Sequence, residues 1–140
     1  MDKQKLAIKV VEKMLADDAF SQWLGMEVED IKPGYAELLM QVRPEMVNGF
    51  NVAHGGVAFS LADSALAFAS NSYGRVALAI ENNISFLKKI TAGDTLTAKT
   101  EELSKGNRIA VYNVVVTNQK GTQIASFRGT VFITKEKHFK

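Results

Sequence analysis

The residues best suited to chemistry lie in one apolar stretch near the middle of the chain. In the segment 47–73, Asp63 is the one formally charged side chain. A lone carboxylate in apolar surroundings is costly to bury, so its presence there indicates a use. The turn His54-Gly55-Gly56 lies just upstream and offers backbone N–H groups at a predicted helix start. A carboxylate base and an amide donor site are the parts needed to hydrolyse an acyl compound.

The spacing of these two parts argues for a site shared between chains. Asp63 follows Gly55 by eight residues, which corresponds to about 12 Å along a helix. Asp63 therefore cannot act on a carbonyl group that is bound at the start of its own helix. If both act on one substrate, the site must lie between two chains whose helices run antiparallel about a two-fold axis. A homodimer is the expected functional unit.

Each of these residues also has a structural interpretation. A buried Asp63 can serve only to cap or to pair. His54 by itself is more often a helix cap, and adjacent glycines can simply allow a helix and a sheet to pack closely. Asn48, which precedes a glycine, is by itself typical of a turn. The combination in this order is what favours a site.

Several other kinds of site find no support in the sequence. The chain has no cysteine, which excludes disulfides, thiol nucleophiles and cysteine-type zinc sites. It has no Gly-x-Ser-x-Gly elbow, no Walker-type phosphate loop and no cluster of metal ligands. Its two histidines are His54 and His138, and the second lies in the C-terminal tail. The sequence therefore argues against a Ser-His-Asp triad.

The composition indicates one domain over residues 1–140. The chain has 140 residues, of which 46% are apolar, and this is enough for a core. A formal net charge of +2 without a basic stripe argues against a nucleic-acid partner. No apolar run is long enough to span a membrane, and the N-terminus lacks the apolar segment of a signal peptide. We expect a cytoplasmic protein without a membrane partner.

Periodicity predicts two main helices and about six strands. Residues 4–15 have helical spacing, and a short turn follows that ends at Gly25. A central helix over about 55–72 is apolar on nearly all sides, so it must be buried. Alternating apolar residues between turn signals predict mostly antiparallel strands over 26–31, 35–42, 76–86, 96–103, 108–118 and 123–134. The polar tail, 135–140, is expected to be frayed.

Together these features resemble the hotdog-fold acyl-CoA thioesterases, specifically the phenylacetate-degradation (PaaI-type) branch. The stronger motifs are Asn48-Gly49, His54-Gly55-Gly56 and Ser60-Leu61-Ala62-Asp63-Ser64-Ala65. The weaker ones are Asn83-Ile84-Ser85-Phe86-Leu87, Ala92-Gly93-Asp94-Thr95-Leu96, Gly106-Asn107-Arg108 and Phe127-Arg128-Gly129-Thr130. The resemblance implies an α+β hotdog fold, in which a curved antiparallel sheet of about six strands wraps around one long central helix. It also implies homodimers with a continuous sheet, and often dimer-of-dimers tetramers.

The resemblance further implies hydrolysis of acyl-CoA without a metal or other cofactor, coenzyme A being part of the substrate. By matching position, Asp63 would be the general base or nucleophile, and the Gly55 amide would polarise the thioester carbonyl. Asn48 would help to place the water or the thioester, and His54 would shape the site. The residues expected to bind substrate are Gly56, Ser64, Asn83, Lys89 and Arg108, the two basic ones through the phosphates of coenzyme A.

At one position the chain departs from the family pattern. Some relatives have a serine that assists the water where this chain has Ala79. That role is either missing here or filled by Asn82, Asn83 or Ser64. An aspartate at position 63, instead of the glutamate of a sister branch, favours the PaaI-type branch over the menaquinone-type thioesterases.

Two other functions remain open at this point. A hotdog hydratase or dehydratase for enoyl-CoA needs a histidine placed against an acid, and His54 is the one candidate. A non-catalytic acyl-CoA binding module would not need Asp63. The sequence does not specify the acyl group, although aryl-acetyl groups such as phenylacetyl are candidates. Aromatic residues that could line its site, or equally form core, are Phe50, Phe59, Phe68, Tyr73 and Phe86.

Overall fold

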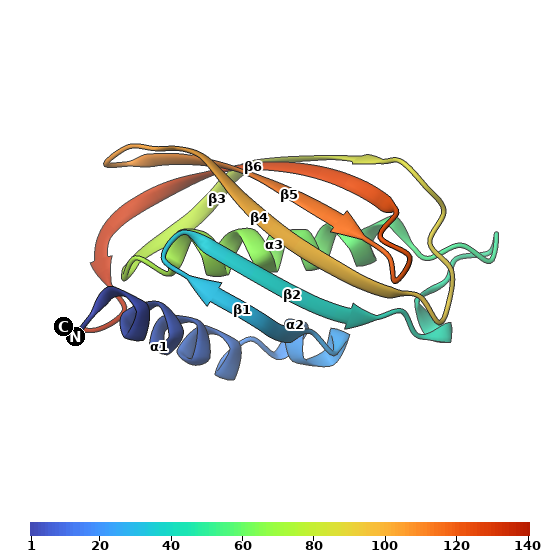
Figure 1. The fold of residues 1–140 in the computed structure, drawn as a ribbon, viewed down its shortest axis with the longest axis horizontal. Helices are drawn as coiled ribbons and strands as arrows, with labels where there is room; N and C mark the ends of the chain where they lie inside the picture. Colours follow the sequence, from blue (N-terminus) through green and yellow to red (C-terminus); the bar gives the residue numbers. More distant parts are fainter.

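A computed structural model describes residues 1–140 as a curved sheet wrapped around one long helix (Figure 1). The helices are α1 (Lys3–Ala16), α2 (Ala19–Leu24) and α3 (Gly55–Asn71), with a 3₁₀ turn η1 (Pro44–Met46). The strands are β1 (Glu27–Lys32), β2 (Tyr35–Gln41), β3 (Arg75–Phe86), β4 (Thr95–Lys105), β5 (Ile109–Thr117) and β6 (Gln123–Lys137). Neighbouring strands are antiparallel in the order β1-β2-β4-β5-β6-β3. The expected α+β hotdog fold is confirmed.

Side-chain caps explain where the helices begin. The Asp2 carboxylate accepts a hydrogen bond from the Lys5 N–H at the start of α1, at 2.8 Å. Asp18 does the same for α2 through the Ser21 N–H, at 3.0 Å. Gly25 then ends α2 with a φ of +78°, a left-handed conformation that favours glycine. None of the helices has the length and the apolar character that a membrane crossing requires.

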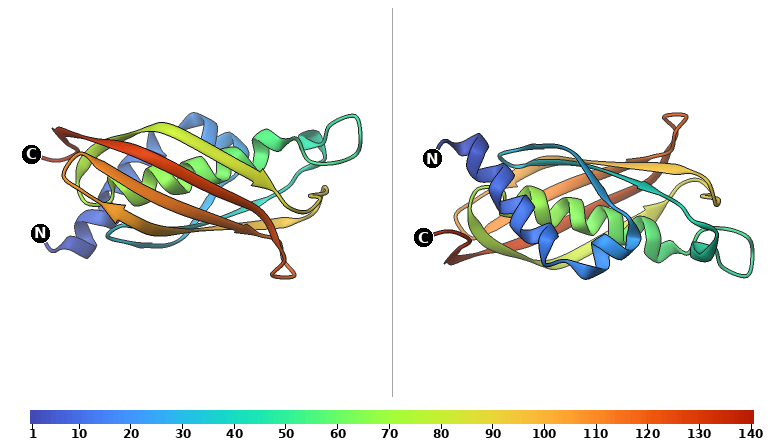
Figure 2. Two further views of the ribbon diagram at one scale, coloured as in Figure 1. Left: turned by 90° about the horizontal axis from the view of Figure 1, so that it is seen from above. Right: turned by 90° about the horizontal axis from the view of Figure 1, so that it is seen from below.

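The central helix α3 is buried on most sides, as its composition predicts. The sheet covers one side of it, and α1 and α2 pack along a flank (Figure 2). Leu61, Ala62 and Leu66 are completely buried in this layer. A half-exposed stripe remains along the helix, and it consists of Gly55, Gly56, Phe59, Ser60, Asp63, Ser64 and Ala67. The stripe contains most of the polar residues of α3.

The alternation of apolar residues predicts the buried face correctly on β2 but not on β3. On β2 the predicted face is buried, because Ala36, Leu38 and Met40 point toward α3 and the core. On β3 the apolar residues Leu78 and Ile80 are each 60% exposed. The physical reason is that the register with β6 shifts between Ala79 and Glu81, so the inward face changes along the strand: Ala77 is buried before the shift, and Ile84 packs against the core after it.

The expectation that the C-terminal tail is frayed is wrong. Strand β6 continues to Lys137, and the His138 N–H donates to the Gly74 carbonyl at 2.9 Å. The His138 ring is within 2.8 Å of the Asn71 side chain at the end of α3, and Lys13 of α1 donates to the His138 carbonyl. The tail is therefore held through His138, which contacts both α1 and the end of α3.

Candidate active site

Asp63 lies in the middle of α3 and is held by a residue from the sheet. The Asn82 Nδ2 group, on β3, donates a hydrogen bond to Asp63 Oδ1 at 2.9 Å. Burial raises the pKa of Asp63, the hydrogen bond from Asn82 partly offsets this rise, and the negative charge of Asp18, the N-cap of α2, adds to it. A carboxylate with a raised pKa is a better proton acceptor than an ordinary aspartate.

The Gly55 amide, at the first position of α3, is a free hydrogen-bond donor. No acceptor in the chain receives its N–H, whereas the Gly56 N–H donates to His54 Nδ1 at 2.9 Å. A side-chain carbon at Gly55 would lie 3.0 Å from the Phe86 ring, so the backbone is approached closely there. A free N–H at the positive end of a helix is suited to bind a developing oxyanion.

His54 is the N-cap of α3. Because its Nδ1 accepts the Gly56 N–H, that nitrogen carries a lone pair, and the proton of the neutral ring lies on Nε2. In this tautomer the free side of the ring can donate a hydrogen bond but cannot accept a proton. The geometry therefore argues against a hydratase that uses His54 as its base.

Asn48 organises the loop that leads into α3. Its Oδ1 accepts hydrogen bonds from the Phe50 N–H at 2.9 Å and the Val52 N–H at 3.4 Å. The loop lies beyond the N-terminal end of α3 (Figure 1). Asn48 therefore belongs to the Gly55 end of the helix, and Asp63 lies about two turns further along. The structure thus keeps the two halves of the predicted site apart within one chain.

The residues expected to bind substrate fall into separate regions. Gly56 lies beside His54, but the Ser64 hydroxyl is within 2.9 Å of the Ser21 hydroxyl and helps to hold α2 on α3. Asn83 is exposed and adjacent to Asn82, so the two side chains point to opposite faces of β3.

Lys89 and Arg108 are both exposed and lie near opposite ends of β4. The strand has 11 residues, which corresponds to about 36 Å. One chain therefore does not bring Lys89 and Arg108 to the same phosphates. No three His, Asp or Glu side chains lie close enough together to hold a metal ion.

A cavity of about 350 Å³ lies beside the N-terminus of α3. Phe20 and Trp23 of α2 form one wall, with stacked rings whose centroids are 6.3 Å apart, and they are 56% and 62% exposed. His54 and Gly56 also line this cavity. Sequence reasoning missed these two aromatic residues; the available signal was their spacing of three on a short helix.

The aromatic residues that the sequence did single out have mixed positions. Phe86 lies against Gly55, and Phe50 is exposed in the loop that precedes α3. Phe68 is buried in the core, Phe59 packs edge-on against Phe127, and Tyr73 donates to Glu102. Of the five, Phe86, Phe50 and Phe59 are near the Gly55 end of α3, and Phe59 follows Gly55 by about one helical turn.

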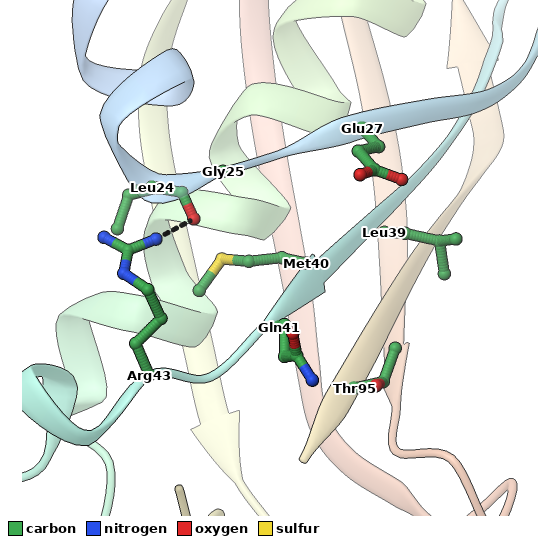
Figure 3. Close-up of a pocket in the computed structure, with 8 residues that line it drawn as sticks. All are labelled: Leu24, Gly25, Glu27, Leu39, Met40, Gln41, Arg43 and Thr95. Atoms are coloured by element: carbon green, nitrogen blue, oxygen red, sulfur yellow. Dashed lines mark hydrogen bonds between the residues drawn. The ribbon is translucent and has the colours of Figure 1, made fainter. Parts of the chain in front are cut away.

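Arg43 fixes the helix that carries the aromatic wall. Its guanidinium donates to the Leu24 carbonyl at 3.1 Å and to the Trp23 carbonyl at 2.8 Å, at the C-terminal end of α2 (Figure 3). It also lies 5.4 Å from the centre of the Trp23 ring. The hollow that Figure 3 shows, about 370 Å³ between α2 and β2, contains none of the predicted site residues. It is not the candidate site.

The chain is similar to known thioesterases in sequence and in structure. The sequence pattern of the Thioesterase superfamily matches residues 50–125. The acyl-coenzyme A thioesterase PaaI of Escherichia coli is 40% identical over 116 residues, which cover 83% of each chain. Human acyl-coenzyme A thioesterase 13 is 26% identical over 126 residues, covering 87% of this chain and 90% of the human one.

Solved structures extend this similarity to three dimensions. The structure of the E. coli PaaI protein from the phenylacetic acid degradation operon superimposes with a TM-score of 0.94 at 35% identity, covering 97% of this chain and 99% of that one. A thioesterase protein from Streptococcus pneumoniae, crystallised with coenzyme A, gives a TM-score of 0.83 at 29% identity. It covers 89% of this chain and 98% of its own.

Proposed function

The chain belongs to the thioesterase superfamily, and from that premise we propose that it hydrolyses acyl-CoA to a free acid and coenzyme A. The observation that carries the proposal is one helix that bears both a free amide donor, at Gly55, and a half-buried carboxylate with a raised pKa, Asp63. These are the two groups that acyl transfer to water requires.

The proposed reaction joins the start of one α3 to the middle of another. The Gly55 N–H of one chain binds the thioester oxygen, and Asp63 of the second chain takes a proton from water as the water oxygen attacks the carbonyl carbon. The resulting oxyanion is held by the Gly55 amide. When it collapses, the C–S bond breaks and the sulfur leaves with the proton as coenzyme A. Alternatively, the Asp63 carboxylate attacks the carbonyl carbon itself, the C–S bond breaks and coenzyme A leaves as the thiolate, which takes up a proton. Water then hydrolyses the mixed anhydride to the free acid and restores the Asp63 carboxylate.

Strand β3 supports the homodimer that this reaction needs. It is an edge of the sheet, so one row of its backbone hydrogen-bonding groups is free to pair with another strand. Leu78 and Ile80 add exposed apolar surface on the same strand. Pairing of two β3 strands about a two-fold axis would extend the sheet and set the two α3 helices antiparallel. A dimer of such dimers is the tetramer we propose.

We propose an aryl-acetyl group, such as phenylacetyl, as the acyl part of the substrate, and the cytoplasm as the place of action. The cavity beside Gly56 is walled by the rings of Phe20 and Trp23, and flat aromatic surfaces stack well on an aryl group. The E. coli relative is described as a protein of the phenylacetic acid degradation operon.

Release of free thiol from a panel of aryl-acetyl-, benzoyl- and straight-chain acyl-CoA esters tests the proposed function. We expect release with phenylacetyl-CoA and no water addition to an enoyl-CoA, because a hydratase needs a histidine beside its acid and the tautomer of His54 leaves that ring unable to accept the proton. Hydration without thiol release would favour the hydratase, and tight binding without either reaction would favour the non-catalytic module.

Neutralising Lys89 or Arg108 tests the contact with coenzyme A. We expect Lys89→Ala and Arg108→Ala each to raise KM for acyl-CoA by a few-fold, on the order expected for exposed charge pairs, and less so at high salt. KM for a short pantetheine thioester, which lacks the nucleotide phosphates, should stay unchanged. Lys32→Ala, at an exposed lysine at the end of β1, is the matched control. Equal changes with both substrates would assign these residues to solvated turns.

A further inference from the structure

On the inner face of β3, one polar atom of the Asn82 amide has a hydrogen-bond partner and the other has none. Its Nδ2 donates to Asp63 Oδ1 at 2.9 Å, whereas its own Oδ1 is buried without any hydrogen-bond partner. Gly129 of β6 is its neighbour across the sheet, and a side-chain carbon there would lie 2.7 Å from Asn82 Oδ1 and closer still to Leu66. The absence of a side chain at Gly129 therefore leaves the space that the amide of Asn82 occupies.

The orientation of this amide gives Asp63 a hydrogen bond and leaves the Oδ1 of Asn82 without one. A buried acceptor without a donor costs free energy, so a side chain that only filled this space would be better apolar. Turning the amide over would point Oδ1 at the carboxylate of Asp63, and two acceptors repel each other. The Asp63 side chain makes no other hydrogen bond in the chain, and its Oδ2 is left without a partner.

We propose that Asn82 is a positioning residue for thioester hydrolysis, which holds the Asp63 carboxylate through Oδ1 and leaves Oδ2 for the water or the carbonyl carbon. This inference rests on the proposed function, because it gives the Asp63–Asn82 contact a task in that reaction. Asn82 acts through Asp63, since its own Oδ1 is buried. Of the three residues that the sequence offered in place of the missing serine, the contact supports Asn82.

The contact also has an electrostatic consequence that can be measured. A hydrogen bond donated to a carboxylate stabilises its ionised form and lowers its pKa. Burial raises that pKa, and so does the charge of Asp18, the N-cap of α2 and the one charged group that acts on Asp63 in the chain. Without the Asn82 donor, the two raising effects are unopposed. Asp63 would then ionise only at higher pH.

The test compares Asn82→Leu, which has nearly the same size but no donor, with Asn82→Asp, which adds a negative charge. We expect kcat for phenylacetyl-CoA at its pH plateau to fall about tenfold in Asn82→Leu, as for a misplaced catalytic group, with KM unchanged. The acidic limb of the pH profile should move to higher pH in Asn82→Leu and further in Asn82→Asp. Asn118→Ala, which removes a side chain that accepts two hydrogen bonds in the β5–β6 turn, is the control for simple destabilisation. It should lower the melting temperature and leave the limb in place.

An acidic limb that does not move in Asn82→Leu would overturn the proposal, whatever happens to kcat, because loss of a donor that lowers the pKa of Asp63 must move that limb to higher pH. Asn82→Ala, which leaves space and introduces no overpacking, serves the same test if the larger variants do not fold. A carbon-13 NMR titration measures the pKa of the Asp63 carboxyl without substrate. It should show a higher pKa in Asn82→Leu or Asn82→Ala than in the wild type. If the wild-type protein releases no thiol, the proposed function fails, and this titration still decides whether Asn82 controls Asp63.

Discussion

Replacing Asp63 by asparagine is expected to lower kcat for thioester hydrolysis by about 100-fold or more, the loss that removal of a general base or nucleophile produces. The substitution keeps the size of the side chain and an oxygen that can accept the Asn82 hydrogen bond. The positions of α3 and β3 should therefore be retained. Steady-state kinetics with phenylacetyl-CoA measure the loss, and a folded variant with wild-type kcat would make Asp63 a structural residue.

The stability of Asp63→Asn provides the matched control for that loss. Because the pKa of Asp63 is raised in the folded state, folding binds protons, and the ionised carboxylate opposes folding above the pKa of the unfolded chain. We expect the melting temperature of Asp63→Asn to equal or exceed that of the wild type at neutral pH. The difference should disappear at low pH, where the carboxyl is protonated in both states. A variant that is inactive because it is unfolded would show the opposite.

Refolding two inactive variants together is expected to restore activity. Gly55→Pro removes the one N–H that the mechanism uses at the start of α3, and the backbone tolerates it. Proline suits the first position of a helix, the N–H has no acceptor to lose, and His54 before it is already extended, with φ −57° and ψ 137°. Mixed dimers of Gly55→Pro and Asp63→Asn contain one site with both groups intact. Their activity should approach half of the wild-type value per active dimer, which thiol release measures after the hybrid is purified.

Gly55→Ala separates the effect of losing the N–H from the effect of adding a side-chain carbon. Both substitutions place a carbon close to the Phe86 ring, which is 54% exposed and free to shift, but alanine keeps the N–H. Gly55→Ala should therefore be much more active than Gly55→Pro. Hybrids that stay inactive, or a fully active monomer, would contradict a site shared between two chains.

The sequence predicted those parts of the fold that local patterns control. The helix start at His54-Gly55-Gly56, the end of the short second helix at Gly25 and the buried face of β2 all follow from residue type and spacing, and the structure contains them. The separation between Gly55 and Asp63 also follows, because the rise of a helix is fixed. The resemblance to PaaI-type thioesterases then supplied the fold and the reaction class.

What the sequence did not predict depends on contacts between distant segments. The tail was expected to be loose, because nothing local shows that Asn71 and Lys13 would bind His138. Ser64 was expected near the substrate, but its hydroxyl faces Ser21, which lies 43 positions away along the chain. The choice of Asn82 among three candidates required the distance to Asp63, and the two aromatic residues of α2 required knowledge of which cavity they face.

Strand β3 has a consequence for how activity would depend on the amount of protein. The strand carries the residue that holds Asp63, and it is also the edge through which we propose that two chains join. A lone chain would then hold Asp63 in position but would lack the Gly55 amide of a second chain, and it would be inactive. By mass action, specific activity would fall when the protein is diluted below the dissociation constant of the dimer. Substrate that bridges the two chains would restore it. The concentration of the enzyme would thereby act as a control on its own turnover.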